Sequence, residues 1–122
     1  MLLARDPHSA RIARDAVAEE LDRAGWSAGS IDAARVCVSE LVSNALLHGE
    51  GQPLVSVDAR DGAVLVEVHD DGRATDLVYS TVQQGFGVRL VDELADAWGV
   101  RSTRGEGKTV WFELLDVLGD DV

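Results

Sequence analysis

Three polar side chains in the segment 38–49 have the types and the spacing needed for metal-assisted chemistry. Glu40, Asn44 and His48 follow one another at intervals of four residues, so in a helix they share one face. Burying a carboxylate and a carboxamide beside an apolar stripe is costly without partners, and Mg²⁺ with its waters would supply them. We therefore expect Asn44 to offer a metal ligand and Glu40 to orient or deprotonate a nucleophile. An isolated Glu-x-x-x-Asn pair is more commonly a solvated helix face.

Two further segments place polar groups at the ends of expected elements. Asp70 ends a strand-like run and Gly72 follows it, so the carboxylate can accept a hydrogen bond from a ligand amino group while the backbone approaches closely. Gly85 and Gly87 precede a helical pattern, and backbone N–H groups at a helix N-terminus attract anions such as phosphate. Each segment alone is also compatible with an ordinary turn.

A fourth segment, Gly107-Lys108-Thr109, leads into a strand. The glycine permits a tight turn, and Thr109 places a hydroxyl at the start of the strand. The segment is not a Walker loop, because it lacks that spacing and precedes a strand instead of a helix. A plain hairpin is the alternative.

The apolar periodicity predicts an α+β, two-layer α/β sandwich, with helices packed on one face of a mixed, mostly antiparallel sheet. We expect a single domain over residues 1–122, with an edge strand from the first few residues. Helix 1 should begin at Asp6-Pro7 and end before Gly25, and helix 2 should be capped by Ser27 or Ser30 and stop at Gly49. The remaining expected elements are strands at 54–59 and 63–69, a loop at 70–84, a helix at 87–98, and strands at 98–102 and 109–115.

Charge and composition exclude several classes of protein. Eleven basic against 22 acidic side chains give a net charge of −11, so direct nucleic-acid binding is not expected. No apolar run approaches the ~20 residues of a membrane span, and Arg5 and Asp6 come too early for a signal peptide. Cys37 is the only cysteine, which excludes an internal disulfide and favours a reducing, cytoplasmic location.

Together and in this order, the four segments resemble the nucleotide-binding motifs of the GHKL ATPases, the group of DNA gyrase, MutL and histidine kinases. Within that group, residues 38–49 are similar to the RsbW/SpoIIAB-type anti-sigma factor serine kinases. The resemblance covers nearly the whole chain, from the first helix to Leu115. It implies the Bergerat fold, with ATP and Mg²⁺ held between helices and a mixed sheet.

The resemblance also implies a role for individual residues of the four motifs. Asn44 would ligate Mg²⁺ and Glu40 would be the general base, whereas His48 would either contact the ligand or cap the helix end. The other implied roles are adenine recognition through the amino group by Asp70 with Gly72 beside it, phosphate binding by Gly85 and Gly87, and support of the adenine end by Thr109.

The function implied is that of an ATP-binding anti-sigma factor and protein serine/threonine kinase. Such a protein binds a sigma factor and phosphorylates a STAS-type anti-anti-sigma partner, and homodimers are common in the subgroup. The alternative is a catalytically weak, nucleotide-gated binding module that regulates a sigma factor or another partner. The segment 83–86 favours this alternative, because kinase members often have an arginine there and this chain has Gln83, Gln84 and Phe86, with Arg89 as the nearest cation.

Overall fold

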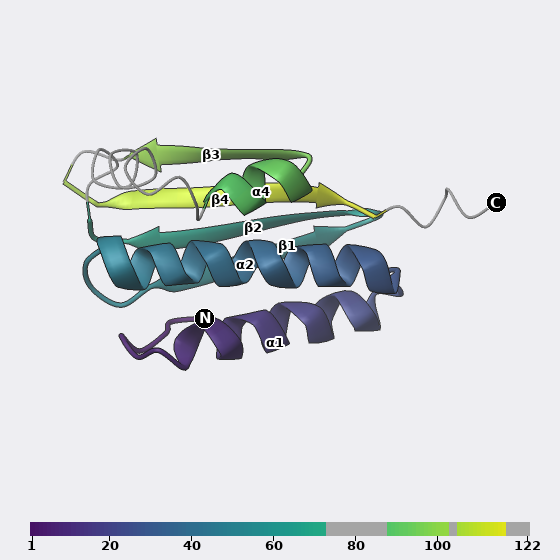
Figure 1. Cartoon of the computed structure of the whole chain (residues 1–122), viewed down its shortest axis with the longest axis horizontal. Helices are drawn as coiled ribbons and strands as arrows, with labels where there is room; N and C mark the ends of the chain where they lie inside the picture. The colour runs from purple at the N-terminus through teal and green to yellow at the C-terminus, as the bar shows by residue number, and fades with distance from the viewer. Residues whose placement is uncertain (73–87, 103–104, 117–122) are drawn as a thin grey trace.

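The computed structural model describes residues 1–72, 88–102 and 105–116. Within these residues the fold has two layers, with helices packed against one face of an antiparallel sheet (Figure 1). The predicted α+β fold class is confirmed. The elements are α1 (Ser9–Arg23), α2 (Ala28–His48), β1 (Leu54–Arg60), β2 (Ala63–Asp70), α4 (Val88–Leu94), β3 (Ala97–Ser102) and β4 (Lys108–Leu115).

The described strands are arranged in the order β1-β2-β4-β3, and every pairing among them is antiparallel. Chain-adjacent strands form the β1–β2 and β3–β4 hairpins, which short turns can close without a crossover. In the first turn Gly62 has a φ of 71°, a conformation that glycine adopts without a steric penalty. The expected N-terminal edge strand is present as a short bridge between Leu2 and Leu54.

Helices α1 and α2 run along the strand direction and lie side by side (Figure 1). Ser27 is the N-cap of α2, and its Oγ accepts a hydrogen bond from the Ser30 backbone N at 3.4 Å. The Ser27 hydroxyl also donates to Asp116 Oδ1 at 2.9 Å, which connects the start of α2 to the end of β4. Helix α1 begins at Ser9, later than expected, because Asp6 Oδ1 accepts from the His8 backbone N at 2.7 Å and holds residues 6–8 in a turn.

Buried and more exposed side chains alternate strictly along β2 and β4, and the buried ones face the helices. In β2 every second residue is buried, and the last residue of the strand is one of them. In β4 every second residue is buried as well, beginning with the first residue of the strand. The helices cover this face with their own apolar stripes. The buried strand residues are Val64, Val66, Val68 and Asp70 in β2, and Lys108, Val110, Phe112 and Leu114 in β4.

Helix α4 is shorter than the pattern predicted, ending at Leu94 instead of near Trp98. The Ala95 backbone N still makes a helical hydrogen bond to Val91 O at 2.8 Å. The Asp96 backbone N instead donates to Glu113 O of β4 at 2.9 Å. Pairing with β4 therefore diverts the chain into β3 before the helix can add a turn. None of the helices in the described ranges has the length and apolar character to cross a bilayer.

Candidate functional site

The second half of α2 carries Glu40, Asn44 and His48 along one flank, as the four-residue spacing predicted. All three are half-buried, because the flank lies between the core-facing stripe of α2 and its exposed side. Helix α2 ends at His48, and the Gly49 backbone N donates to Ala45 O at 3.0 Å. The flank therefore ends where the chain turns toward β1.

Asn44 carries a buried side-chain nitrogen that no described residue satisfies. Its Nδ2 is buried and has no hydrogen-bond partner among the described residues. Buried polar atoms are normally paired, so an unpaired one marks a place where a ligand can bind. A half-turn of the carboxamide exchanges its N and O, so this position can equally offer an oxygen.

The side chains near Asn44 do not form a complete metal cage by themselves. Within the part of the chain that the structure describes, no group of three or more His, Cys, Asp or Glu side chains is placed to hold a metal ion. Mg²⁺ is typically bound by one or two protein oxygens, with waters and substrate phosphates completing its coordination. Asn44 fits that pattern as the protein ligand of a nucleotide-bound Mg²⁺.

Glu40 lies one turn before Asn44 in a partly desolvated position. Burial raises the pKa of its carboxyl above the usual value of 4.5, since removal from water disfavours the charged form. The neighbouring Cys37 thiol is fully buried, and burial together with the Glu40 charge raises its pKa to about 12, so it stays protonated at neutral pH. Glu40 also lines a cavity of about 370 Å³, together with Arg14, Asp32, Arg35, Val36 and Ser39.

Glu40→Gln should raise the free energy of unfolding at neutral pH. The folded-state pKa of Glu40 is raised, so the contribution of Glu40 to stability is most favourable below its unfolded pKa and is lost as the pH rises through its folded pKa. Glutamine mimics the protonated acid and removes this loss. Urea unfolding from pH 4 to 8 should show the two proteins diverging with rising pH. Glu50→Gln, at an exposed position, is the control, and a variant less stable than wild type at pH 7 would contradict the prediction.

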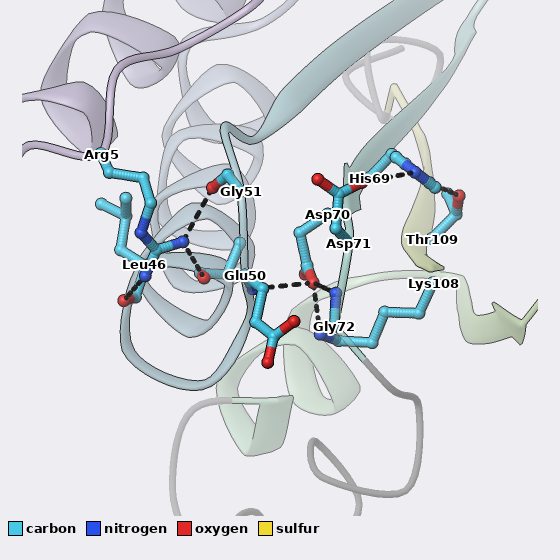
Figure 2. Close-up of polar contacts among 11 residues, drawn as sticks. Arg5, Leu46, Glu50, Gly51, His69, Asp70, Asp71, Gly72, Lys108 and Thr109 are labelled. Atoms are coloured by element: carbon cyan, nitrogen blue, oxygen red, sulfur yellow. Dashed lines mark hydrogen bonds and ion pairs between the residues drawn. The ribbon is translucent and has the colours of Figure 1, made fainter. Parts of the chain in front are cut away.

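Asp70 ends β2 with its side chain pointing into the protein, where it is 1% exposed. Its Oδ1 accepts three hydrogen bonds (Figure 2): from Lys108 Nζ at 2.8 Å, from the Gly72 backbone N at 2.6 Å and from the Glu50 backbone N at 3.4 Å. Glu50, which makes the last of these contacts, lies two residues after the end of α2. The structure therefore brings the end of α2 and the end of β2 together.

Glycines around Asp70 make this close packing possible. A Cβ at Gly49 would lie 2.5 Å from Asp70 Cγ, and one at Gly72 would lie 2.8 Å from Asp70 Oδ1. Gly107 has a φ of 87°, and a Cβ there would overlap the Asp70 carbonyl oxygen. Any side chain at these three positions would clash with Asp70, so the close approach of the backbone to Asp70 requires glycine at each of them.

Thr109 does not lie beside the Asp70 carboxylate. Its Oγ1 is 3.0 Å from His69 Nδ1 (Figure 2), on the sheet face opposite to the helices. Because side chains alternate along a strand, the residue of β4 that reaches Asp70 is Lys108, its register partner. Gly85 and Gly87 lie outside the described residues.

Sequence reasoning missed two cations in this region, Lys108 and Arg5. The alternation Val110, Phe112, Leu114 would have placed Lys108 on the buried face. Arg5 offered no sequence signal. Its guanidinium donates from Nη2 to Leu46 O at 2.6 Å, in the last turn of α2, where a cation is favoured. Its Nη1 donates to Gly51 O at 2.9 Å, in the segment that follows the helix.

Comparison with known proteins agrees with this arrangement. The family model of the histidine kinase-like ATPase domain matches residues 3–114. Comparison with curated proteins gives no match. The fold is similar to a solved structure described as the crystal structure of the RsbU and RsbW domains of Rv1364c from Mycobacterium tuberculosis, with a TM-score of 0.76 and 21% sequence identity.

That structural match covers 95% of this chain and 31% of the other, so this chain spans less than a third of that protein's length. At such low identity the likeness shows the fold alone. The family match extends from Leu3, the residue after the N-terminal bridge, to Leu114 in β4 and so includes both ends of the site. The chain belongs to the histidine kinase-like ATPase domain family.

Proposed function

We propose that this protein binds ATP with Mg²⁺ and acts as an anti-sigma factor and protein serine/threonine kinase on a STAS-type anti-anti-sigma partner. Membership of the ATPase domain family supports nucleotide binding. Likeness in fold to a structure that contains an RsbW domain supports the anti-sigma kinase subgroup.

One observation carries the proposal: the segment that follows the C-terminus of α2 and the carboxylate that ends β2 meet at one end of the fold. The Glu50 backbone N donates to Asp70 Oδ1, and the Asp71 backbone N donates to Glu50 O at 2.8 Å. The resemblance assigns the Mg²⁺ to Asn44 on the flank and the adenine amino group to Asp70. This pair of backbone contacts supports the proposal, because it holds the end of β2 against the segment that follows α2.

The residues of the flank divide the chemistry between them. Asn44 would hold the Mg²⁺, and this ion when bound would neutralise charge on the phosphates. Glu40 would accept the proton from a partner serine hydroxyl. Its raised pKa brings the carboxylate nearer to the operating pH, which strengthens it as a base. The proposal keeps Gly85 and Gly87 as phosphate-binding residues.

Isothermal titration calorimetry with ATP and ADP, with and without Mg²⁺, tests nucleotide binding. We expect Asn44→Ala to weaken the Mg²⁺-dependent part of the affinity by at least about tenfold, since loss of even a supporting residue at a metal site costs that much. Ser43→Ala, the adjacent α2 residue that instead lines a cavity with Arg5 and Leu47, is the matched control. No heat or thermal shift at millimolar nucleotide would contradict the proposal.

The alternative is a nucleotide-gated binding module that transfers nothing. It is favoured by Arg89, the cation nearest in sequence to the segment 83–86, which is exposed in α4 and whose Nε lies 3.7 Å from Glu93 Oε1. Phosphoryl transfer depends on charge stabilisation at the transferring group, and Arg89 would have to leave this contact to supply it. Incubation with radiolabelled ATP and a cognate STAS protein separates the two functions, because only the kinase forms phosphoserine.

A further inference from the structure

The cavity that Glu40 lines lies between α1 and α2 and is also lined by two arginines. Arg14 comes from α1 and Arg35 from α2, and Ser39 adds a hydroxyl. Its volume of about 370 Å³ lies in the range of small-ligand sites. Neither Asn44 nor Asp70 lines this cavity, so it is distinct from the positions proposed for Mg²⁺ and for adenine.

Arg14 brings an unsatisfied donor to this cavity. Its Nε is buried and has no hydrogen-bond partner among residues 1–72, 88–102 and 105–116. Asp32 and Glu40 line the same cavity, yet neither of them accepts from this atom. An unpaired buried donor is costly, and a guanidinium stays charged at any physiological pH. Arg14 therefore requires an acceptor that the described residues do not supply.

Arg35 is available to the same acceptor. In the described part of the chain its Nη2 lies 3.8 Å from Oδ1 of Asp15, and the two side chains are 42% and 57% exposed. A surface ion pair at this distance contributes little to stability, so Arg35 can exchange it for a better partner at small cost. The forked N–H donors of a guanidinium match the two oxygens of a planar oxyanion, which is the ligand chemistry that two arginines favour.

The acids of the cavity favour a carboxylate over a phosphate. Arg14 and Arg35 are balanced by Asp32 and Glu40, so the formal net charge of the lining residues is zero. A phosphate monoester carries a charge of about −1.5 to −2 near neutral pH and would be repelled by the two acids. A carboxylate carries a single negative charge and can still pair with both arginines. The cavity therefore fits an acidic side chain.

We propose that the cavity between α1 and α2 binds the carboxylate of an Asp or Glu that adjoins the hydroxyl-bearing residue of the protein substrate, with Arg14 as the residue that recognises it. Arg14 and Arg35 hold the carboxylate, and the neighbouring Ser or Thr hydroxyl reaches Glu40 in the same cavity. This inference rests on the proposed kinase function for the role of the hydroxyl. Binding of the carboxylate can be measured without ATP.

NMR titration of the ¹⁵N-labelled full chain with the capped dipeptide N-acetyl-aspartyl-seryl amide tests the proposal. The Nε–Hε signal of Arg14, identified by its loss in Arg14→Gln, should shift saturably with a dissociation constant in the millimolar range. The asparaginyl analogue has the same shape without the charge. It should bind at least about tenfold more weakly, because a hydrogen bond to a charged group is stronger than one to a neutral group.

Arg14→Gln should weaken binding of the aspartyl peptide by about tenfold or more, since it removes the charge that the carboxylate pairs with. Its affinity for ATP with Mg²⁺ should stay at the wild-type value, because the nucleotide positions lie outside the cavity. Arg23→Gln is the matched control, since Arg23 is an exposed residue of α1 that pairs with Glu19 and does not line the cavity. It should bind both ligands as the wild type does.

Equal binding of the aspartyl and asparaginyl peptides by the wild type, or no saturable shift of the Arg14 signal, overturns the carboxylate site and leaves the proposed function in place. Peptide binding by a protein that binds no nucleotide overturns the proposed function and the role of the site in transfer, while the carboxylate site itself stands. The comparison of the two peptides uses the wild type, so it decides the proposal even where Arg14→Gln fails to fold.

Discussion

Glu40→Gln should lower the rate of phosphoryl transfer to a STAS partner by about 100-fold or more, the usual contribution of a positioned general base. Glutamine has the size of glutamate and can still hydrogen-bond the serine hydroxyl, but it cannot take the proton. Affinity for ATP should stay within a few-fold, because the substitution removes a proton acceptor and not a binding group. Single-turnover transfer from radiolabelled ATP, together with calorimetry, measures both quantities.

Glu50→Gln is the control for this substitution, since Glu50 is an exposed acid near the same end of α2 that the proposed mechanism does not use. Rapid transfer by Glu40→Gln would show that another group accepts the proton. Nucleotide-dependent partner binding by the wild type, with no phosphoserine after hours, would instead favour the binding module. Glu40→Gln should be more stable than wild type at neutral pH, so its loss of activity could not be attributed to unfolding.

Lys108→Met should lower the free energy of unfolding by about 3–5 kcal/mol, because it leaves the Asp70 carboxylate buried and unpaired. Domains of this size are stable by only about 5–15 kcal/mol, so the loss is a large fraction of the total. The hydrogen bonds from Gly72 and Glu50 to Oδ1 remain and offset only part of the cost. Urea unfolding followed by circular dichroism gives the value.

The double variant that combines Asp70→Asn with Lys108→Met should lose much less stability than the sum of the two single variants. It removes both charges, and the carboxamide oxygen introduced at position 70 can still accept from the Gly72 backbone N. Arg101→Met is the control. Arg101 pairs with Glu67 on the opposite face of the sheet, and a surface ion pair contributes only about 0–1 kcal/mol. Additive losses in this double-mutant cycle would mean that Lys108 and Asp70 do not interact as the geometry indicates.

Local periodicity was sufficient to predict α2 and the order of side chains along it. Glu40, Asn44 and His48 share a flank because the helical repeat places residues four apart on one face, whatever packs around them. The strands also followed from alternation, since Val64, Val66 and Val68 predict one buried face. The end of α4 could not be predicted this way, because it depends on the hydrogen bond from the Asp96 backbone to β4.

The pairing of Asp70 with Lys108 depended on tertiary structure. The two residues are 38 positions apart, and they meet only because β2 and β4 pair in a register that places one opposite the other. A shift of one residue would reverse the faces and place Thr109 beside the carboxylate instead. The sequence by itself determined which residues of α2, β2 and β4 share a face, since that follows from local backbone geometry. Only the tertiary structure decided which side chain meets the buried Asp70 carboxylate, because strand register is set by contacts between segments far apart in the chain.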